Sequence, residues 1–93
     1  MNQGDIAMEN ITLQINGIQP DFDQARNIAA VLAQNNDDDI MLISWNDRTR
    51  DMHSPSCLQC EIKDTPGWEV YGINHGGRLR ISINDDDYVF IFS

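Results

Sequence analysis

The stretch that decides the fold is RLRISINDDDYVFIF, residues 78–92 of the 93-residue chain. Its first part, Arg78–Ile83, alternates polar and apolar residues, as a strand with one buried face does. Its last part, Tyr88–Phe92, is apolar throughout, which predicts a strand that is covered on both faces and does not lie at an edge of the sheet. Asn84–Asp87 consists of good turn formers. Residues 78–92 therefore predict two antiparallel strands joined by a short turn.

Further strands are predicted outward from this pair. Trp68–Ile73 is rich in strand-forming residues, and His75–Gly77 would be the turn after it. Ile40–Trp45 is nearly all apolar and predicts a central strand. Ile11–Ile15 alternates with period two and predicts a half-buried strand. The residues near Leu58–Ile62 would form either a further short strand or a turn.

One helix is predicted between the first two strands. Asp21 is a suitable N-cap, and Gln24 follows three residues later, as in a capping box. The helix should end near Gln34. Its apolar residues recur at spacings of three and four, which places them on one face. These residues are Phe22, Ala25, Ile28, Ala29 and Leu32.

These elements predict an α+β fold with two layers, in which one helix packs on a mainly antiparallel sheet of four to five strands in the order β-α-β-β-β-β. We expect residues 1–93 to form a single domain, with a flexible segment at 1–10 and a long loop at 46–64. One helix can cover only one face of such a sheet. The second face then needs cover from the loop at 46–64 or from a second copy of the chain, which predicts a homodimer.

The charge of the chain excludes several kinds of partner. The net charge is -9, with only six Lys and Arg residues. A surface this acidic repels nucleic acids and anionic membranes. No apolar run approaches the roughly 18 residues of a membrane span, and no secretory signal is visible, so we expect a soluble cytoplasmic protein. Five of the six basic residues lie between residues 48 and 80, where they would pair locally or form a pocket for a small anion.

The cysteines form the only motif that suggests metal or redox chemistry. Cys57 and Cys60 are two residues apart, so their thiolates can reach one metal ion from a tight turn. His53 and His75 would complete a four-ligand site for zinc or iron. We expect no cofactor unless this site forms, in which case zinc is the candidate. The same cysteines would alternatively cycle between dithiol and disulfide. The third interpretation is that both are ordinary reduced thiols, as is usual in the cytoplasm.

No residue pattern marks an enzyme. His53 with Asp47 or Asp51 would form an acid–base pair, but no nucleophile accompanies it. The sequence therefore favours a non-enzymatic binding or adaptor module, with the metal or thiol protein as the alternative. Its binding surface would include two arginines of the predicted loop and two tryptophans at strand ends. The alternative for the tryptophans is that they are core residues. The four residues of this predicted surface are Trp45, Arg48, Arg50 and Trp68.

Overall fold

The computed structural model describes residues 8–34, 40–56 and 65–93. Its elements, in chain order, are β1 (Glu9–Leu13), α1 (Phe22–Gln34), β2 (Leu42–Asp47), β3 (Met52–Ser54), α2 (Gly67–Asn74), β4 (Leu79–Ile83) and β5 (Tyr88–Phe92). Within these residues, neither helix is long and apolar enough to cross a membrane.

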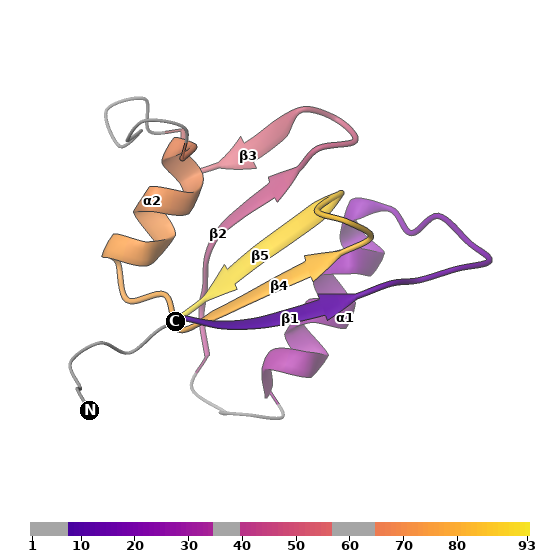
Figure 1. Ribbon diagram of the computed structural model, residues 1–93, viewed down its shortest axis with the longest axis horizontal. Helices are drawn as coiled ribbons and strands as arrows, with labels where there is room; N and C mark the ends of the chain where they lie inside the picture. Colours follow the sequence, from indigo (N-terminus) through magenta and orange to yellow (C-terminus); the bar gives the residue numbers. More distant parts are fainter. Residues whose placement is uncertain (1–7, 35–39, 57–64) are drawn as a thin grey trace.

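The five strands form one sheet in the order β1-β4-β5-β2-β3 (Figure 1). β1 runs parallel to β4, and all other neighbours are antiparallel. The β4–β5 hairpin therefore lies between β1 and β2, which are the two strands that α1 connects. This arrangement confirms the predicted α+β class. The five strands and α1 follow the predicted β-α-β-β-β-β order, and α2 is an additional helix between β3 and β4. The arrangement also confirms that Tyr88–Phe92 forms an interior strand rather than an edge.

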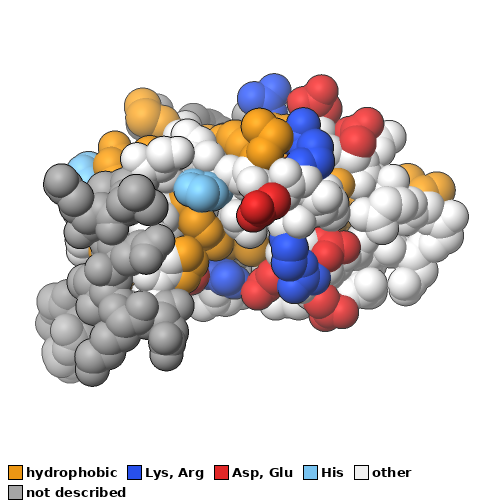
Figure 2. Space-filling model, turned by 90° about the horizontal axis from the view of Figure 1, so that it is seen from above, with side chains coloured by type: hydrophobic (Ala, Val, Ile, Leu, Met, Phe, Trp, Pro, Cys, Tyr) orange, Lys and Arg blue, Asp and Glu red, His pale blue; other side chains and the backbone are white. Residues whose placement is uncertain are grey.

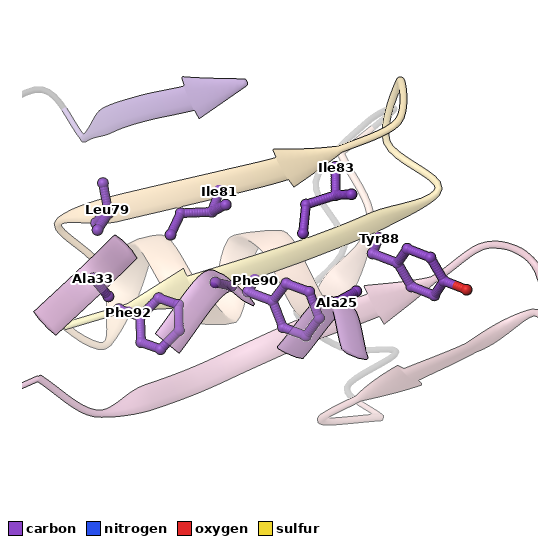
Figure 3. Close-up of a cluster of buried hydrophobic side chains, with 9 residues drawn as sticks. Ala25, Ala33, Leu79, Ile81, Ile83, Tyr88, Phe90 and Phe92 are labelled. Carbon is purple, nitrogen blue, oxygen red and sulfur yellow. The ribbon is translucent and has the colours of Figure 1, made fainter. Parts of the chain in front are cut away.

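α1 begins as the sequence predicts. The Asp21 Oδ1 accepts a hydrogen bond from the Gln24 N–H at 2.8 Å, and the Gln24 Oε1 accepts one from the Asp21 N–H at 2.9 Å. This reciprocal pair is a capping box. Three small residues of α1 are fully buried, so the helix can lie close to the sheet. Together with β4 and β5 they form the α1-side core (Figure 3), which consists of Ala25, Ala29, Ala33, Leu79, Ile81, Ile83, Tyr88, Phe90 and Phe92.

The strand predicted over Trp68–Ile73 is wrong, because these residues form α2. Glu69 lies in the first turn, where a negative charge suits the helix dipole. Gly76 follows the helix with a positive φ of 88°, and the N–H of Gly77 donates to the carbonyl of Gly72 at 2.8 Å. This bond is the one that closes a Schellman motif. The strand-forming residues of this segment are therefore held in a helix by its end signals and its packing.

α2 covers part of the second face of the sheet. Because successive residues of a strand point to opposite faces, Val89 and Ile91 point away from α1. They pack with Trp68 of α2, and Met8 and Ile43 lie against them, so that these five residues form the α2-side core. The sequence predicts this cover from the loop at 46–64 or from a second copy of the chain. The structure adds a second helix instead, and the homodimer stays a prediction.

Two segment predictions need correction. β2 extends to Asp47 and pairs with β3 after a turn at 48–51, so a hairpin replaces the first part of the loop expected at 46–64. Residues 57–64, with the short strand or turn predicted near Leu58–Ile62, lie outside the described residues. β1 begins at Glu9, so residues 9 and 10 of the segment expected to be flexible belong to a strand, and residues 1–7 lie outside the described residues.

Candidate functional site

A cleft of about 260 Å³ opens where three separate segments meet. They are the start of α1, the turn between β2 and β3, and the first residue of β5. The Tyr88 hydroxyl donates a hydrogen bond of 2.7 Å to the carbonyl of Pro20, which ties β5 to the residues before α1. The residues that line the cleft are Asp21, Phe22, Asp23, Asp47, Thr49, Arg50 and Tyr88.

A fully buried carboxylate forms the base of this cleft. The Asp47 Oδ1 accepts hydrogen bonds from the Thr49 N–H at 3.0 Å and from the Thr49 Oγ1 at 2.6 Å. The Asp47 Oδ2 accepts a hydrogen bond of 2.6 Å from the Nε of Arg50, so the two residues form an ion pair. A buried charge needs this kind of compensation. The buried Asp47 carboxylate therefore fixes the conformation of the β2–β3 turn.

The pKa of the Asp47 carboxyl lies below its ordinary value. Burial alone raises the pKa of Asp47, but hydrogen bonds from Thr49 and Arg50 and the charge of Arg50 together lower it by more. Asp47 is therefore ionised at neutral pH, and it is a weak base.

The same geometry predicts a dependence of stability on pH. The ionised Asp47 stabilises the fold fully above the unfolded-state pKa of about 4, and this contribution is lost as the pH falls through the lower folded-state pKa. We expect Asp47→Asn to reduce the free energy of unfolding by about 2 kcal/mol at neutral pH, because charge-assisted hydrogen bonds are lost. The difference from the parent should shrink below about pH 4 in urea unfolding.

Asp51→Asn is the matched control for this prediction. Asp51 is exposed in the same turn and has a positive φ of 54°, which asparagine tolerates. This variant should stay within about 0.5 kcal/mol of the parent. A difference between Asp47→Asn and the parent that is unchanged from neutral pH to pH 3 would contradict the assigned role of Asp47.

Arg50 forms one wall of the cleft and is held in place on two sides. Its Nε is bound to Asp47, and its guanidinium carbon lies 5.2 Å from the centre of the Phe22 ring. Half of the Arg50 side chain is exposed. Among the described residues, its two terminal nitrogens have no hydrogen-bond partner. Arg50 thus presents a fixed guanidinium edge to whatever enters the cleft.

The structure brings together only some of the predicted binding residues. Trp45 lies beside the cleft, with its ring centre 4.5 Å from that of Phe22. Arg48 points to the neighbouring β4–β5 turn and pairs with Asp87 at 2.7 Å. Trp68 is buried in the α2-side core, on the opposite face of the sheet. Figure 2 shows that basic side chains on the face seen there lie beside acidic ones.

The predicted metal ligands are only partly placed. His53 is exposed on β3, and His75 follows α2 with its ring stacked on Tyr71 at 3.8 Å between centres. Cys57 and Cys60 lie outside the described residues, so the zinc or iron site and the thiol alternative stay predictions. Within residues 8–34, 40–56 and 65–93, no group of three or more His, Cys, Asp and Glu side chains could hold a metal ion.

The acid–base pair of His53 with Asp47 is not formed. His53 lies opposite Asn46 in the β2–β3 pairing, and Asp47 lies opposite Met52. Because successive residues of a strand face opposite sides, His53 and Asp47 are on different faces of the sheet.

Comparison with known proteins identifies a family and a similar structure. The model of the family described as a domain of unknown function (DUF5619) matches residues 8–92. The chain is also similar to a protein of known crystal structure, AF1514 from Archeoglobus fulgidus DSM 4304, described as a novel non-family-model protein. The identity is 28%, the TM-score is 0.78, and the match covers 94% of each chain. No curated protein matches the chain.

Proposed function

The chain belongs to this family of domains of unknown function, and we propose that it is a non-enzymatic binding module whose ligand site is the cleft at the start of α1. The observation that carries the proposal is the fixed position of Arg50, between a buried carboxylate and an aromatic ring. A side chain that is held before a ligand arrives loses less conformational entropy on binding, which favours affinity.

The chemistry of the cleft supports binding rather than turnover. The buried carboxylate, Asp47, has a lowered pKa and all its described hydrogen bonds go to Thr49 and Arg50, so it is a poor general base. The Thr49 hydroxyl donates to that carboxylate and is therefore not activated as a nucleophile. The Tyr88 hydroxyl donates to a backbone carbonyl. Each of these polar groups already has a hydrogen-bond partner within the fold. Among the side chains named here, Arg50 still has N–H donors, on its terminal nitrogens, that a ligand can use.

A nuclear magnetic resonance titration tests this proposal. The ¹⁵N-labelled full chain would be titrated, at millimolar concentration, with a panel of small carboxylates, amines, amino acids, sugars and inorganic phosphate. We expect at least one probe to shift the amide signals of Phe22, Thr49, Arg50 and Tyr88 in a saturable way. Arg50→Gln should weaken this binding by about tenfold, because it removes a charge-assisted contact.

Arg48→Gln is the matched control, since Arg48 lies in the same turn but is paired with Asp87 outside the cleft. It should leave the dissociation constant within about twofold of the parent. The proposal fails if the cleft signals respond to none of the probes, or if the two arginine variants weaken binding equally.

A further inference from the structure

The cleft is lined by charges of both signs. Arg50 comes from the β2–β3 turn, whereas Asp21 and Asp23 come from the start of α1. The Asp47 Oδ2 pairs with the Nε of Arg50 at 2.6 Å, which leaves the terminal nitrogens of Arg50 to interact with a ligand. Asp21 and Asp23 are exposed, and neither forms an ion pair with a described residue. The lining therefore offers both a guanidinium edge and two carboxylates that are not ion-paired with a described residue.

Simple ions fit this lining poorly. A carboxylate alone would bind the terminal nitrogens of Arg50, but it would also approach two negative charges. An ammonium ion alone would be attracted by Asp21 and Asp23, but it would share the cleft with the positive charge of Arg50. A ligand that carries both charges, with its carboxylate and its ammonium group close together, offers a partner of opposite charge to Arg50 and to the two carboxylates at once.

From this juxtaposition, and resting on the proposed function, we infer that the cleft binds an α-amino acid in its zwitterionic form. The ligand carboxylate accepts hydrogen bonds from the terminal nitrogens of Arg50, in the end-on geometry that a guanidinium favours. The ammonium group lies toward Asp21 and Asp23. The side chain contacts the rings that line the cleft, those of Phe22 and Tyr88.

The size of the cleft agrees with a ligand of this class. Its volume of about 260 Å³ lies below the roughly 300–1,000 Å³ of pockets that hold drug-sized molecules. A free amino acid is small enough to enter, and part of it remains in contact with water. Because few ligand atoms are buried, we expect weak binding, with a dissociation constant on the order of 1 mM.

Three matched probes test the inference directly: L-alanine, propionate and ethylamine. Propionate lacks the ammonium group of alanine, and ethylamine lacks its carboxylate. In titrations followed at the amide signals of Phe22 and Arg50, alanine should bind at least about tenfold more tightly than either partial probe, because each loses one charged contact. Larger amino acids such as L-leucine should bind at least as tightly as alanine.

Variants with opposite effects on the probes give a second readout. Asp23→Asn removes one carboxylate, so it should weaken alanine binding by about threefold and strengthen propionate binding. Arg50→Gln should weaken both. Asp23 is exposed on α1, so the variant should fold normally, which the spectrum itself shows.

The outcomes separate this inference from the proposed function. If propionate or ethylamine binds as tightly as alanine, the amino-acid assignment is overturned while a ligand site in the cleft stands. If none of the three binds, the assignment is overturned as well, and the wider panel decides the proposed function by itself. If Asp23→Asn weakens alanine and propionate equally, the ammonium group does not lie toward α1, and the inference fails.

Discussion

Alanine in place of Gly72 is expected to lower the free energy of unfolding by about 2 kcal/mol, although alanine is the better helix former. A Cβ atom at this position would lie 2.7 Å from the Ser44 Oγ and 2.9 Å from the Ile91 Cδ1. Both neighbours are buried, so neither can move away freely. α2 would have to shift from β2 and β5. The helix preference for alanine, about 1 kcal/mol, offsets only part of this cost.

A double-mutant cycle with Ser44 identifies the cause. The Ser44 Oγ is buried and has no hydrogen-bond partner, so Ser44→Ala should be neutral or slightly stabilising. In the Ser44→Ala background, Gly72→Ala should cost at least about 1 kcal/mol less, because the nearest clashing atom is gone. Both values come from urea unfolding.

Ile73→Ala is the matched control for Gly72→Ala, because it introduces alanine at the next position of α2. Ile73 is half exposed, so its replacement should change the free energy of unfolding by about 0.5 kcal/mol or less. If Gly72→Ala is as stable as the parent, α2 does not pack against β2 as closely as the structure shows.

The elements that the sequence predicts well are those specified by neighbouring residues. The start of α1 follows from Asp21 and Gln24, whose side chains cap each other's backbone. The β4–β5 hairpin follows from the alternation in Arg78–Ile83 and from the turn formers after it. These signals act over a few residues, so they do not depend on contacts with distant parts of the chain.

α2 could not be predicted in the same way, because its residues favour a strand. Its end signals are present: Pro66 before the helix, Glu69 in the first turn and Gly76 after it. In the sequence, however, Gly76 also fits the turn of a hairpin. The choice depends on Gly72, which lets the helix approach β2, and that contact joins parts of the chain that are distant in sequence.

The residues of the cleft are likewise distant in sequence. Of the residues that the sequence singles out for binding, Arg50 lines the cleft and Trp45 packs on Phe22 beside it, and their role in binding stays a prediction. Phe22 was assigned only to the helix core, and Tyr88 only to its strand. Tyr88 reaches the cleft because β5 pairs with β2, and Phe22 reaches it because α1 packs on the same sheet. Trp68 is a buried core residue, which is the alternative that the sequence leaves for the tryptophans, although its segment forms a helix and not the predicted strand.

The largest effect on stability is expected from Phe90→Ala, at about 3–5 kcal/mol. Phe90 is fully buried in the central strand β5, between Ile81 on β4 and Trp45 on β2. Its ring centre lies 5.6 Å from that of Phe22 on α1. Removal of the ring leaves a cavity that a paired interior strand cannot close. The loss is large for a domain of this size, whose total stability is typically about 5–15 kcal/mol.

The position of Phe90 also links the core to the cleft. Phe22 packs on Phe90 from one side and supports Arg50 on the other, so the cavity should let the Phe22 ring move away from Arg50. Phe90→Leu keeps most of the volume and should cost about 1 kcal/mol. In urea unfolding with an unchanged slope, a loss below about 1 kcal/mol for Phe90→Ala would contradict the closed α1-side core. The amide signal of Arg50 should shift in Phe90→Ala but not in Val89→Ala, because Val89 faces α2.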